Sequence, residues 1–274
     1  MDLHDSSIKT SIWRVSSHDR TDSNDNTSAF SIDVPASVES FKNVLAIQLL
    51  SASVPSSFYN IDSYNTLEQD VTLEFYYNGV FTSLTIPRGQ YIIVTDRTAS
   101  PFPANDLLSV IETQFASVTG SAITWSYNTV TNKLSIIHAT NTLEIKQTNL
   151  DDVNLWDKLG FLKPQGAATT LTADTIPNIS GVQQIFIHVS QLSNNSVDLD
   201  TQNGISLIGG VLVTAPFGGN NNYEIKSSMA NLIKYTTQRN IDFLDIRLRD
   251  SRGRLININN QDWTMMIRSY YIID

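Results

Sequence analysis

The chain contains four histidines, the residues used most often for acid–base catalysis and metal binding near neutral pH. They are His4, His18, His138 and His188. The four are far apart in the sequence, and none belongs to an H-x-x-H or H-E-x-x-H motif. His188 alternates with Ile187 and Val189, so we expect it on the polar face of a strand. The histidines therefore predict no metal site.

Two acidic groups have a spacing that could bind a cation. Asp19, Asp22 and Asp25 resemble a metal-binding loop, but the stretch lacks the glycine and distal glutamate of a calcium-binding EF-hand. Asp198 and Asp200 could supply oxygen ligands, although a plain loop rich in Ser and Asn is the favoured interpretation. We expect no metal and no cofactor.

Catalytic motifs are also missing from the sequence. There is no G-x-S-x-G motif, and neither Gly209-Gly210 nor Gly218-Gly219 is followed by Lys-Ser/Thr and a helix, as phosphate-binding loops require. Paired carboxylates, as in glycosidases, could come from any of 27 acidic residues, and no pair is favoured. We expect a protein that is not an enzyme.

Aromatic and basic clusters allow two binding interpretations. Tyr76, Tyr77, Trp125 and Tyr127 could form a platform that stacks on sugars, although packing within a sheet is the default for aromatic residues at strand spacing. Arg247, Arg249, Arg252 and Arg254 are interleaved with Asp245 and Asp250. We interpret these arginines as the solvated face of a hairpin.

Composition restricts the possible partners and compartments. The net charge is −9, which disfavours direct binding of nucleic acid, and only 16% of the residues are charged. The chain has no cysteine, and its first residues lack the apolar core of a signal peptide. We expect it to fold in a cytosol-like compartment.

The elements that would position these residues are mainly strands near the two ends of the chain. We expect an N-terminal arm at 1–26, a first sandwich part at 27–86, an inserted α+β domain at 87–176, and a second sandwich part at 177–274. The hairpin 71–86, with its Asn78-Gly79 turn, could belong to either domain.

Helix signals occur only inside the expected insertion. One helix should begin after Asp106 and end at Gly120, and a shorter one should run from Asp151 to Gly160. About eight strands remain outside the insertion. They suit an all-β fold, a single jelly-roll β-sandwich carrying a small α+β insertion.

Several segments together resemble the minor capsid (penton) proteins of virophages, polinton-type elements and related large double-stranded DNA viruses. They are IWRVSSHDRTDSNDNTSAFSIDVP (12–35), NVLAIQLLSASVPSSFYNI (43–61), IPRGQY (86–91), SYNTVTNKLSI (126–136), KLGF (158–161), IDFLDIRLRDSRGRLI (241–256) and NNQDWTMMIRS (259–269). The resemblance covers most of the chain and lies in the order of these patterns. It has no invariant motif and assigns no catalytic residue.

The resemblance implies a homopentameric capsomer at the icosahedral vertices, in contact with trimers of the major capsid protein. The protein would be assembled in the host cytoplasm or nucleus and located in the virion. Trp13 and Arg14 in the arm are the predicted capsid contacts, and the insertion could bind a host receptor. A glycan- or receptor-binding module, such as an adhesin or fibre head, is the alternative. A polysaccharide-active enzyme is a third class, and the sequence does not distinguish fivefold from threefold closure.

Overall fold

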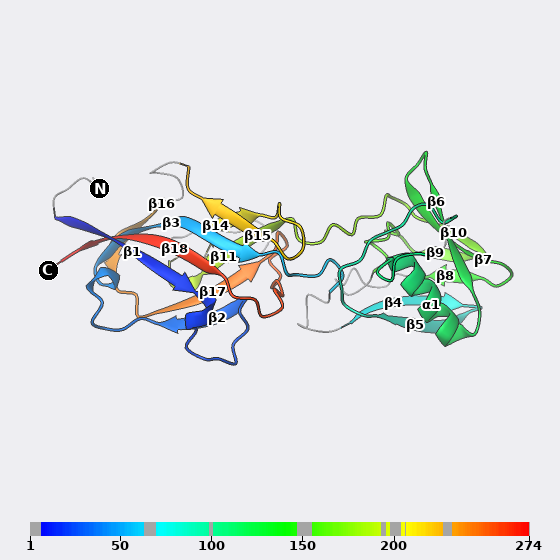
Figure 1. Cartoon of the computed structure of the whole chain (residues 1–274), viewed down its shortest axis with the longest axis horizontal. Helices are drawn as coiled ribbons and strands as arrows, with labels where there is room; N and C mark the ends of the chain where they lie inside the picture. The colour runs from blue at the N-terminus through cyan, green and yellow to red at the C-terminus, as the bar shows by residue number, and fades with distance from the viewer. Residues whose placement is uncertain are drawn as a thin grey trace. The chain divides into compact units, whose positions relative to one another are not determined.

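A computed structural model of the chain describes residues 7–62, 70–98, 101–146, 155–192, 196–197, 204–205, 207–226 and 232–273. The described part of the protein is mostly β. It divides into two compact units (Figure 1). Unit 1 contains Met1–Phe58 and Val182–Asp274, and unit 2 contains Tyr59–Gly181.

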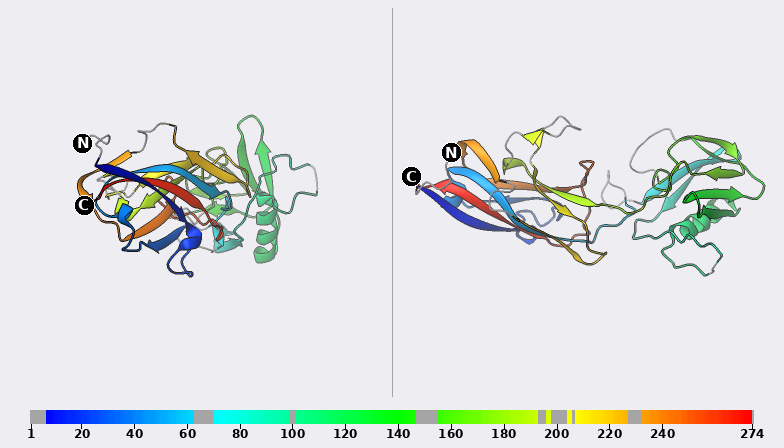
Figure 2. Two further views of the ribbon diagram at one scale, coloured as in Figure 1. Left: turned by 60° about the vertical axis from the view of Figure 1, so that its left-hand side comes forward. Right: turned by 90° about the horizontal axis from the view of Figure 1, so that it is seen from above.

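Unit 1 consists of two antiparallel sheets (Figures 1 and 2). The first has the order β1 (Ile8–Ser16), β18 (Thr264–Ile272), β3 (Val44–Pro55) and β15 (Asn220–Glu224), and β16 (Leu232–Arg239) pairs with another part of β3. The second has the order β14 (Leu207–Leu212), β11 (Gln184–Val189), β17 (Phe243–Arg249) and β2 (Ala29–Asp33). A short hairpin joins β12 (Ser196–Val197) to β13 (Gly204–Ile205), and single 3-10 turns occupy Ser17–Asp19, Glu39–Phe41 and Ser190–Leu192.

The strand order of unit 1 is that of a jelly roll. The chain begins in the first sheet, crosses to the second at β2, and returns at β3. It then passes through β11 and β14 of the second sheet, β15 and β16 of the first, β17 of the second and β18 of the first. The orders β1-β18-β3-β15 and β14-β11-β17-β2, linked in this way, are those of the double Greek key of a jelly roll, and β16 is an additional strand of the first sheet. The predicted fold class, an all-β single jelly-roll sandwich with a small α+β insertion, is confirmed.

Alternation of side chains builds the core of unit 1. In β11, Ile185 and Ile187 are fully buried, and they face the buried Ile246 and Leu248 of the paired strand β17 on the same side of the sheet. Gly209 in β14 comes close to the buried Leu49 of β3, because a Cβ at this position would lie 2.4 Å from Leu49 Cδ2. Glycine at 209 thus permits close packing between the sheets.

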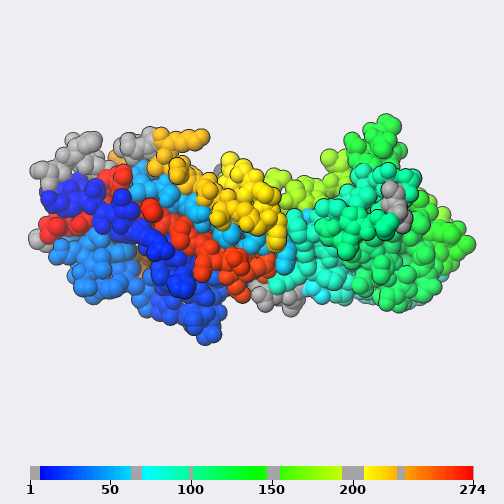
Figure 3. All heavy atoms as spheres, in the orientation of Figure 1, coloured from blue at the N-terminus to red at the C-terminus, as the bar shows by residue number. Residues whose placement is uncertain are grey.

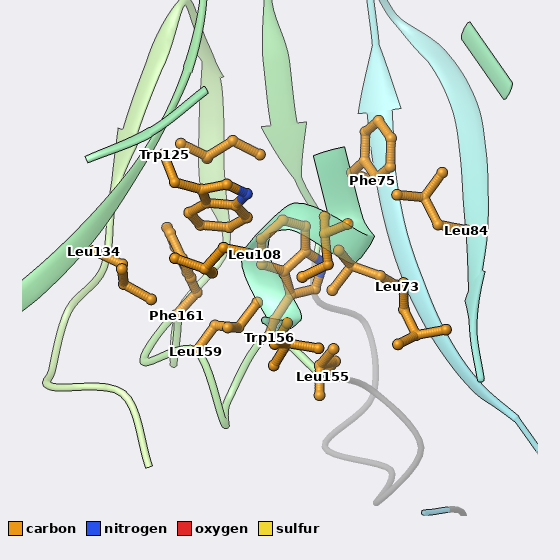
Figure 4. Packing of buried hydrophobic residues seen from close by; sticks show 14 of the residues in the cluster. Leu73, Phe75, Leu84, Leu108, Trp125, Leu134, Leu155, Trp156, Leu159 and Phe161 are labelled. Carbon is orange, nitrogen blue, oxygen red and sulfur yellow. The ribbon is translucent and has the colours of Figure 1, made fainter. Parts of the chain in front are cut away.

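The described residues of unit 2 form one helix and two small sheets. One sheet has the order β5 (Val80–Ile86), β4 (Val71–Tyr77), β8 (Leu143–Ile145) and β9 (Gln165–Ala168). The other has the order β10 (Thr170–Thr172), β7 (Lys133–His138) and β6 (Ile123–Asn128), and α1 spans Leu107–Thr119. Residues of α1 and both sheets form one apolar core around Trp156 and Phe161 (Figure 4).

The two predicted helices have different outcomes. α1 begins at the predicted place, with Asp106 as its N-cap, and ends at Gly120, whose φ of 68° is left-handed. The second helix is wrong where its residues are described, because 155–160 form turns and only the Leu159 N–H bonds four residues back, to the Leu155 carbonyl. Its predicted start, 151–154, lies outside the described residues.

The predicted N-terminal arm is wrong for residues 8–16, which form β1 and pair along their whole length with β18. This edge strand contributes only two buried apolar side chains, Trp13 and Val15, to the core. Its other residues are mostly polar, so the sequence did not show the alternation expected of a strand. The glycine- and asparagine-rich stretch 218–222 contains the start of β15.

The boundaries of the insertion also differ from those expected. Unit 2 begins at Tyr59 and ends at Gly181, compared with the predicted 87 and 176. Hairpin 71–86 therefore belongs to unit 2, where β4 also pairs with β8. Its turn is as predicted, with positive φ at both Asn78 and Gly79.

Candidate assembly surface

Trp13 and Arg14, the predicted capsid contacts, point in opposite directions because neighbouring residues of a strand face opposite sides. Trp13 is 6% exposed. Its ring stacks on Phe41 with centroids 3.7 Å apart, and its indole N–H donates to Ser40 Oγ at 3.2 Å. Trp13 is a core residue of unit 1, so its predicted role as an outward anchor does not fit this structure. Arg14 is exposed, and its role as a contact stays a prediction.

The strand register places Arg14 in a row that crosses the first sheet. Arg14 lies opposite Met266 of β18, Met266 opposite Ser51 of β3, and Ser51 opposite Glu224 of β15. Residues directly opposite in antiparallel strands share one face, so all four side chains lie on the outer face of this sheet. The face is turned towards the viewer in Figure 3, where β1 is blue, β18 red, β3 light blue and β15 yellow.

A shallow hollow lies along this row, and we call it the trough. It has a volume of about 180 Å³ and includes a second row formed by Thr264, Ser53 and Asn222. The middle of the trough is low because Ser51 and Ser53 have short side chains, whereas Arg14 and Glu224 stand at its two ends. Among the described residues, none of these four side chains has a hydrogen-bond or ion-pair partner.

Ser121 and His138 in unit 2 form a contact that resembles a nucleophile–base pair. Ser121 Oγ is 2.7 Å from His138 Nε2. His138 Nδ1 accepts the backbone N–H groups of Thr140 at 3.1 Å and Asn141 at 2.8 Å, so Nδ1 carries no proton. The proton of the neutral ring is therefore on Nε2, which donates to Ser121 and cannot act as its base. The pair stabilises the turn after β7.

The aromatic residues considered as a sugar platform do not share a surface. Trp125 is buried in the core of unit 2, and Tyr77 packs against the same core. Tyr76 faces the other side of β4, where its ring meets Phe81 at 5.6 Å. The platform of these four residues is wrong, because alternation along β4 separates the two tyrosines.

Two arginines of the cluster in unit 1 stabilise the turn that follows β17. Arg254 Nη2 lies 2.7 Å from Asp250 Oδ2, and Arg249 donates to the Gly253 carbonyl. Arg247 pairs with Asp245 at 3.3 Å on the strand face. Burial and the nearby Arg247 lower the pKa of Arg249 from its ordinary value. The interpretation as a solvated face holds for Arg247 and Arg252, which are exposed, but it does not hold for Arg249 and Arg254, which are partly buried.

Of the residues considered as metal ligands, Asp19, Asp22 and Asp25 lie within the described ranges. No group of three or more His, Asp or Glu residues in those ranges is arranged to hold a metal ion. Asp198, Asp200 and His4 lie outside the described residues. Within the same ranges no helix has the length and hydrophobicity needed to cross a membrane.

A buried charged network that the sequence did not indicate lies at the start of α1. Arg97 donates to Asp106 and, at 2.9 Å, to Glu112, and it stacks over Phe102 with its Cζ 3.9 Å from the ring centroid. The sequence identified Asp106 only as the residue that precedes the helix. No sequence pattern pointed to Arg97 as its partner, because Arg97 lies in an irregular loop. The network fixes that loop to α1.

No protein-family model matches the chain, and no curated protein matches its sequence. Two solved structures are similar to it over nearly its whole length. The mavirus penton protein has 8% identity and a TM-score of 0.42, covering 97% of this chain and 100% of its own. A chain of the Sputnik virophage structure has 13% identity and a TM-score of 0.42, covering 96% of this chain and 98% of its own. The fold assignment itself rests on the strand order described above.

Proposed function

We propose that the chain is a structural capsid protein, the penton capsomer that closes icosahedral vertices as a homopentamer. The observation that carries this proposal is a complete jelly roll interrupted once, between β3 and β11, by a separately folded unit. The resemblance of the sequence to penton proteins of virophages and polinton-type elements supports the same role. A jelly roll assembles through its surfaces and needs no catalytic site.

In this role the outer face of the first sheet, including Arg14, contacts trimers of the major capsid protein. The protein is a virion component at the vertices, assembled in the host cytoplasm or nucleus. It binds itself and capsid partners, and its net charge of −9 gives no basis for direct binding of nucleic acid.

The first test is the native mass of the purified protein, measured by native mass spectrometry. A particle of about five times the 30.5 kDa subunit supports the penton proposal. A trimer would point to a fibre head or another capsomer. A chain that stays monomeric and is absent from purified virions would contradict the proposal.

A second candidate function, binding of a host receptor or glycan by unit 2, is favoured by one exposed aromatic pair. Phe81 is 54% exposed beside Tyr76, and Lys146 Nζ lies 4.2 Å from the centroid of the Tyr76 ring. Aromatic rings with a nearby cation are frequent at recognition surfaces. A glycan array with the wild-type protein and with F81S tests this role. It would count against the role if the wild-type protein bound no glycan, or if F81S bound as well as the wild type.

A further inference from the structure

The trough across the first sheet of unit 1 has the dimensions and charges of a binding site for an extended peptide. Its volume of about 180 Å³ is below the range of roughly 300–1,000 Å³ typical of small-molecule pockets. It can accept one or two side chains of a segment lying on the surface. A cofactor or metabolite would have too little contact there.

The two ends of the trough carry opposite charges at a defined separation. Arg14 is on β1 and Glu224 on β15, and β18 and β3 lie between them. Three strand spacings of about 4.8 Å place the two backbones about 14 Å apart. An extended peptide advances about 3.4 Å per residue, so its residues i and i+4 also lie about 14 Å apart and point to the same side.

The floor of the trough suits the middle of such a peptide. Met266 is 45% exposed and offers an apolar contact to residue i+2. The hydroxyl groups of Ser51, Ser53 and Thr264 line the same hollow and bond to no other described residue. They can pair with backbone N–H and C=O groups of a bound segment.

We infer that the trough binds an extended segment of another capsid chain, with a basic residue at i, a small apolar residue at i+2 and an acidic residue at i+4. The basic residue pairs with Glu224 and the acidic residue with Arg14. The choice of occupant follows from charge complementarity, because Arg14 and Glu224 stand at opposite ends of the trough. A second copy of this chain is the alternative occupant that the test distinguishes. The inference rests on the proposed capsid role only for the source of the segment.

Peptide titration of the full chain, labelled with [13C]methyl-methionine, tests this inference. The chain has four methionines, and Met266 is exposed in the trough whereas the adjacent Met265 is 1% exposed. The probe is the peptide Lys-Thr-Val-Thr-Asp with blocked ends. The matched control, Lys-Thr-Val-Asp-Thr, has the same composition, but its acidic residue at i+3 points to the opposite side.

We expect the probe to shift the Met266 methyl signal to saturation, with a smaller effect at Met265 and weaker binding in high salt. R14E makes both ends acidic and should weaken binding of the probe about fivefold. The same variant should gain affinity for Lys-Thr-Val-Thr-Lys. E224K should show the reverse preference, for Asp-Thr-Val-Thr-Asp. An unchanged Met265 signal verifies that each variant is folded.

Equal shifts with the probe and the control peptide would overturn the inference, as would binding that R14E and E224K leave unchanged. Broadening of the Met266 signal with protein concentration alone, before any peptide is added, would identify a second copy as the occupant and overturn it as well. The titration does not require assembly. If the peptide does not bind, the trough inference fails, but a pentameric mass would still support the penton proposal. If the protein is monomeric, the penton proposal loses its support, but peptide binding would still support the trough inference.

Discussion

Asp106 is fully buried at the first turn of α1, and its carboxylate accepts hydrogen bonds from three residues. Burial alone would raise its pKa, but the bonds from Ser109, the Val94 N–H and Arg97 outweigh that effect, so the pKa is lowered from its ordinary value. A group with a lowered folded pKa stabilises the fold above its unfolded pKa of about 3.9, and this contribution is lost as the pH falls through the folded value.

We expect D106N to lower the free energy of unfolding of unit 2 by about 2–3 kcal/mol at pH 7, because Arg97 loses the buried one of its two carboxylate partners and keeps only Glu112. The difference from wild type should begin to shrink below about pH 3.9, the unfolded pKa, and should vanish as the pH falls through the lowered pKa of Asp106 in the folded protein. Hydrogen exchange of unit 2 amides at several pH values measures both effects. D33N, at an exposed position in β2, is the control and should change little. A difference that stays constant as the pH is lowered from 7 into the acidic range would contradict this explanation.

Gly160 has a φ of +92°, a backbone conformation that other residues adopt at a cost. A Cβ there would lie 2.3 Å from the Thr175 carbonyl oxygen, which is backbone and cannot rotate away. G160A should therefore destabilise unit 2 by more than about 1 kcal/mol, measured as a lower Tm. G166A is the matched control, because a Cβ at 166 meets no atom within 4 Å. Equal Tm values for the two variants would refute the strain at Gly160.

At the scale of elements, β1 has two faces with different roles. Its inner face contributes Trp13 and Val15 to the core, and its outer face presents Arg14 in the trough. The strand bonds only to β18, so it is an edge of the first sheet. Its contribution to stability comes from the inner face, and any contact with another chain comes from the outer face or the edge.

W13A and R14A separate these two roles. Removing the buried indole should destabilise unit 1 by about 3–5 kcal/mol, because it leaves a cavity beside Phe41. R14A should change stability by less than about 0.5 kcal/mol, because its side chain is exposed and has no partner among the described residues. Urea unfolding followed by tryptophan fluorescence measures both. A stable W13A protein that fails to enter capsids would restore Trp13 as an external anchor.

At the scale of the whole molecule, hydrogen bonds within unit 2 connect the segment where the chain enters this unit to the segment where it leaves. The Asn60 side chain donates to the carbonyls of Tyr91 at 2.7 Å and Ile179 at 2.9 Å, and it accepts the Tyr91 N–H at 2.8 Å. The first and last residues of unit 2 are therefore held together by unit 2 itself. Each unit has its own hydrophobic core.

We expect residues 59–181 to fold when expressed alone, and unit 1 to fold when a short Gly/Ser linker replaces them. The expected result is that amide NMR spectra of the two pieces together reproduce most signals of the full chain. Deletion of 87–160 is the contrasting variant and should unfold the remainder of unit 2, because it removes α1 and the sheet β10-β7-β6 loses two strands. An unfolded 59–181 fragment would show that unit 2 depends on unit 1.

The sequence alone determined the features that depend on neighbouring residues. Alternation identified β11 and β17, Asn78-Gly79 identified a hairpin turn, and Asp106 and Gly120 marked the ends of α1. These signals are local because helix caps and turns involve residues within about four positions. The jelly-roll class followed from the number and spacing of such strands.

Only the tertiary structure decided which segments meet. β1 is a strand because it pairs with β18, from Ile8 opposite Ile272 to Ser16 opposite Thr264, and no local pattern reports a partner at the other end of the chain. Of the trough, the sequence indicated Arg14 alone. Met266, Ser51 and Glu224 join it through register across three strand pairs. The boundaries at Tyr59 and Gly181 likewise depend on which contacts each strand makes, which becomes fixed only when the sheets form.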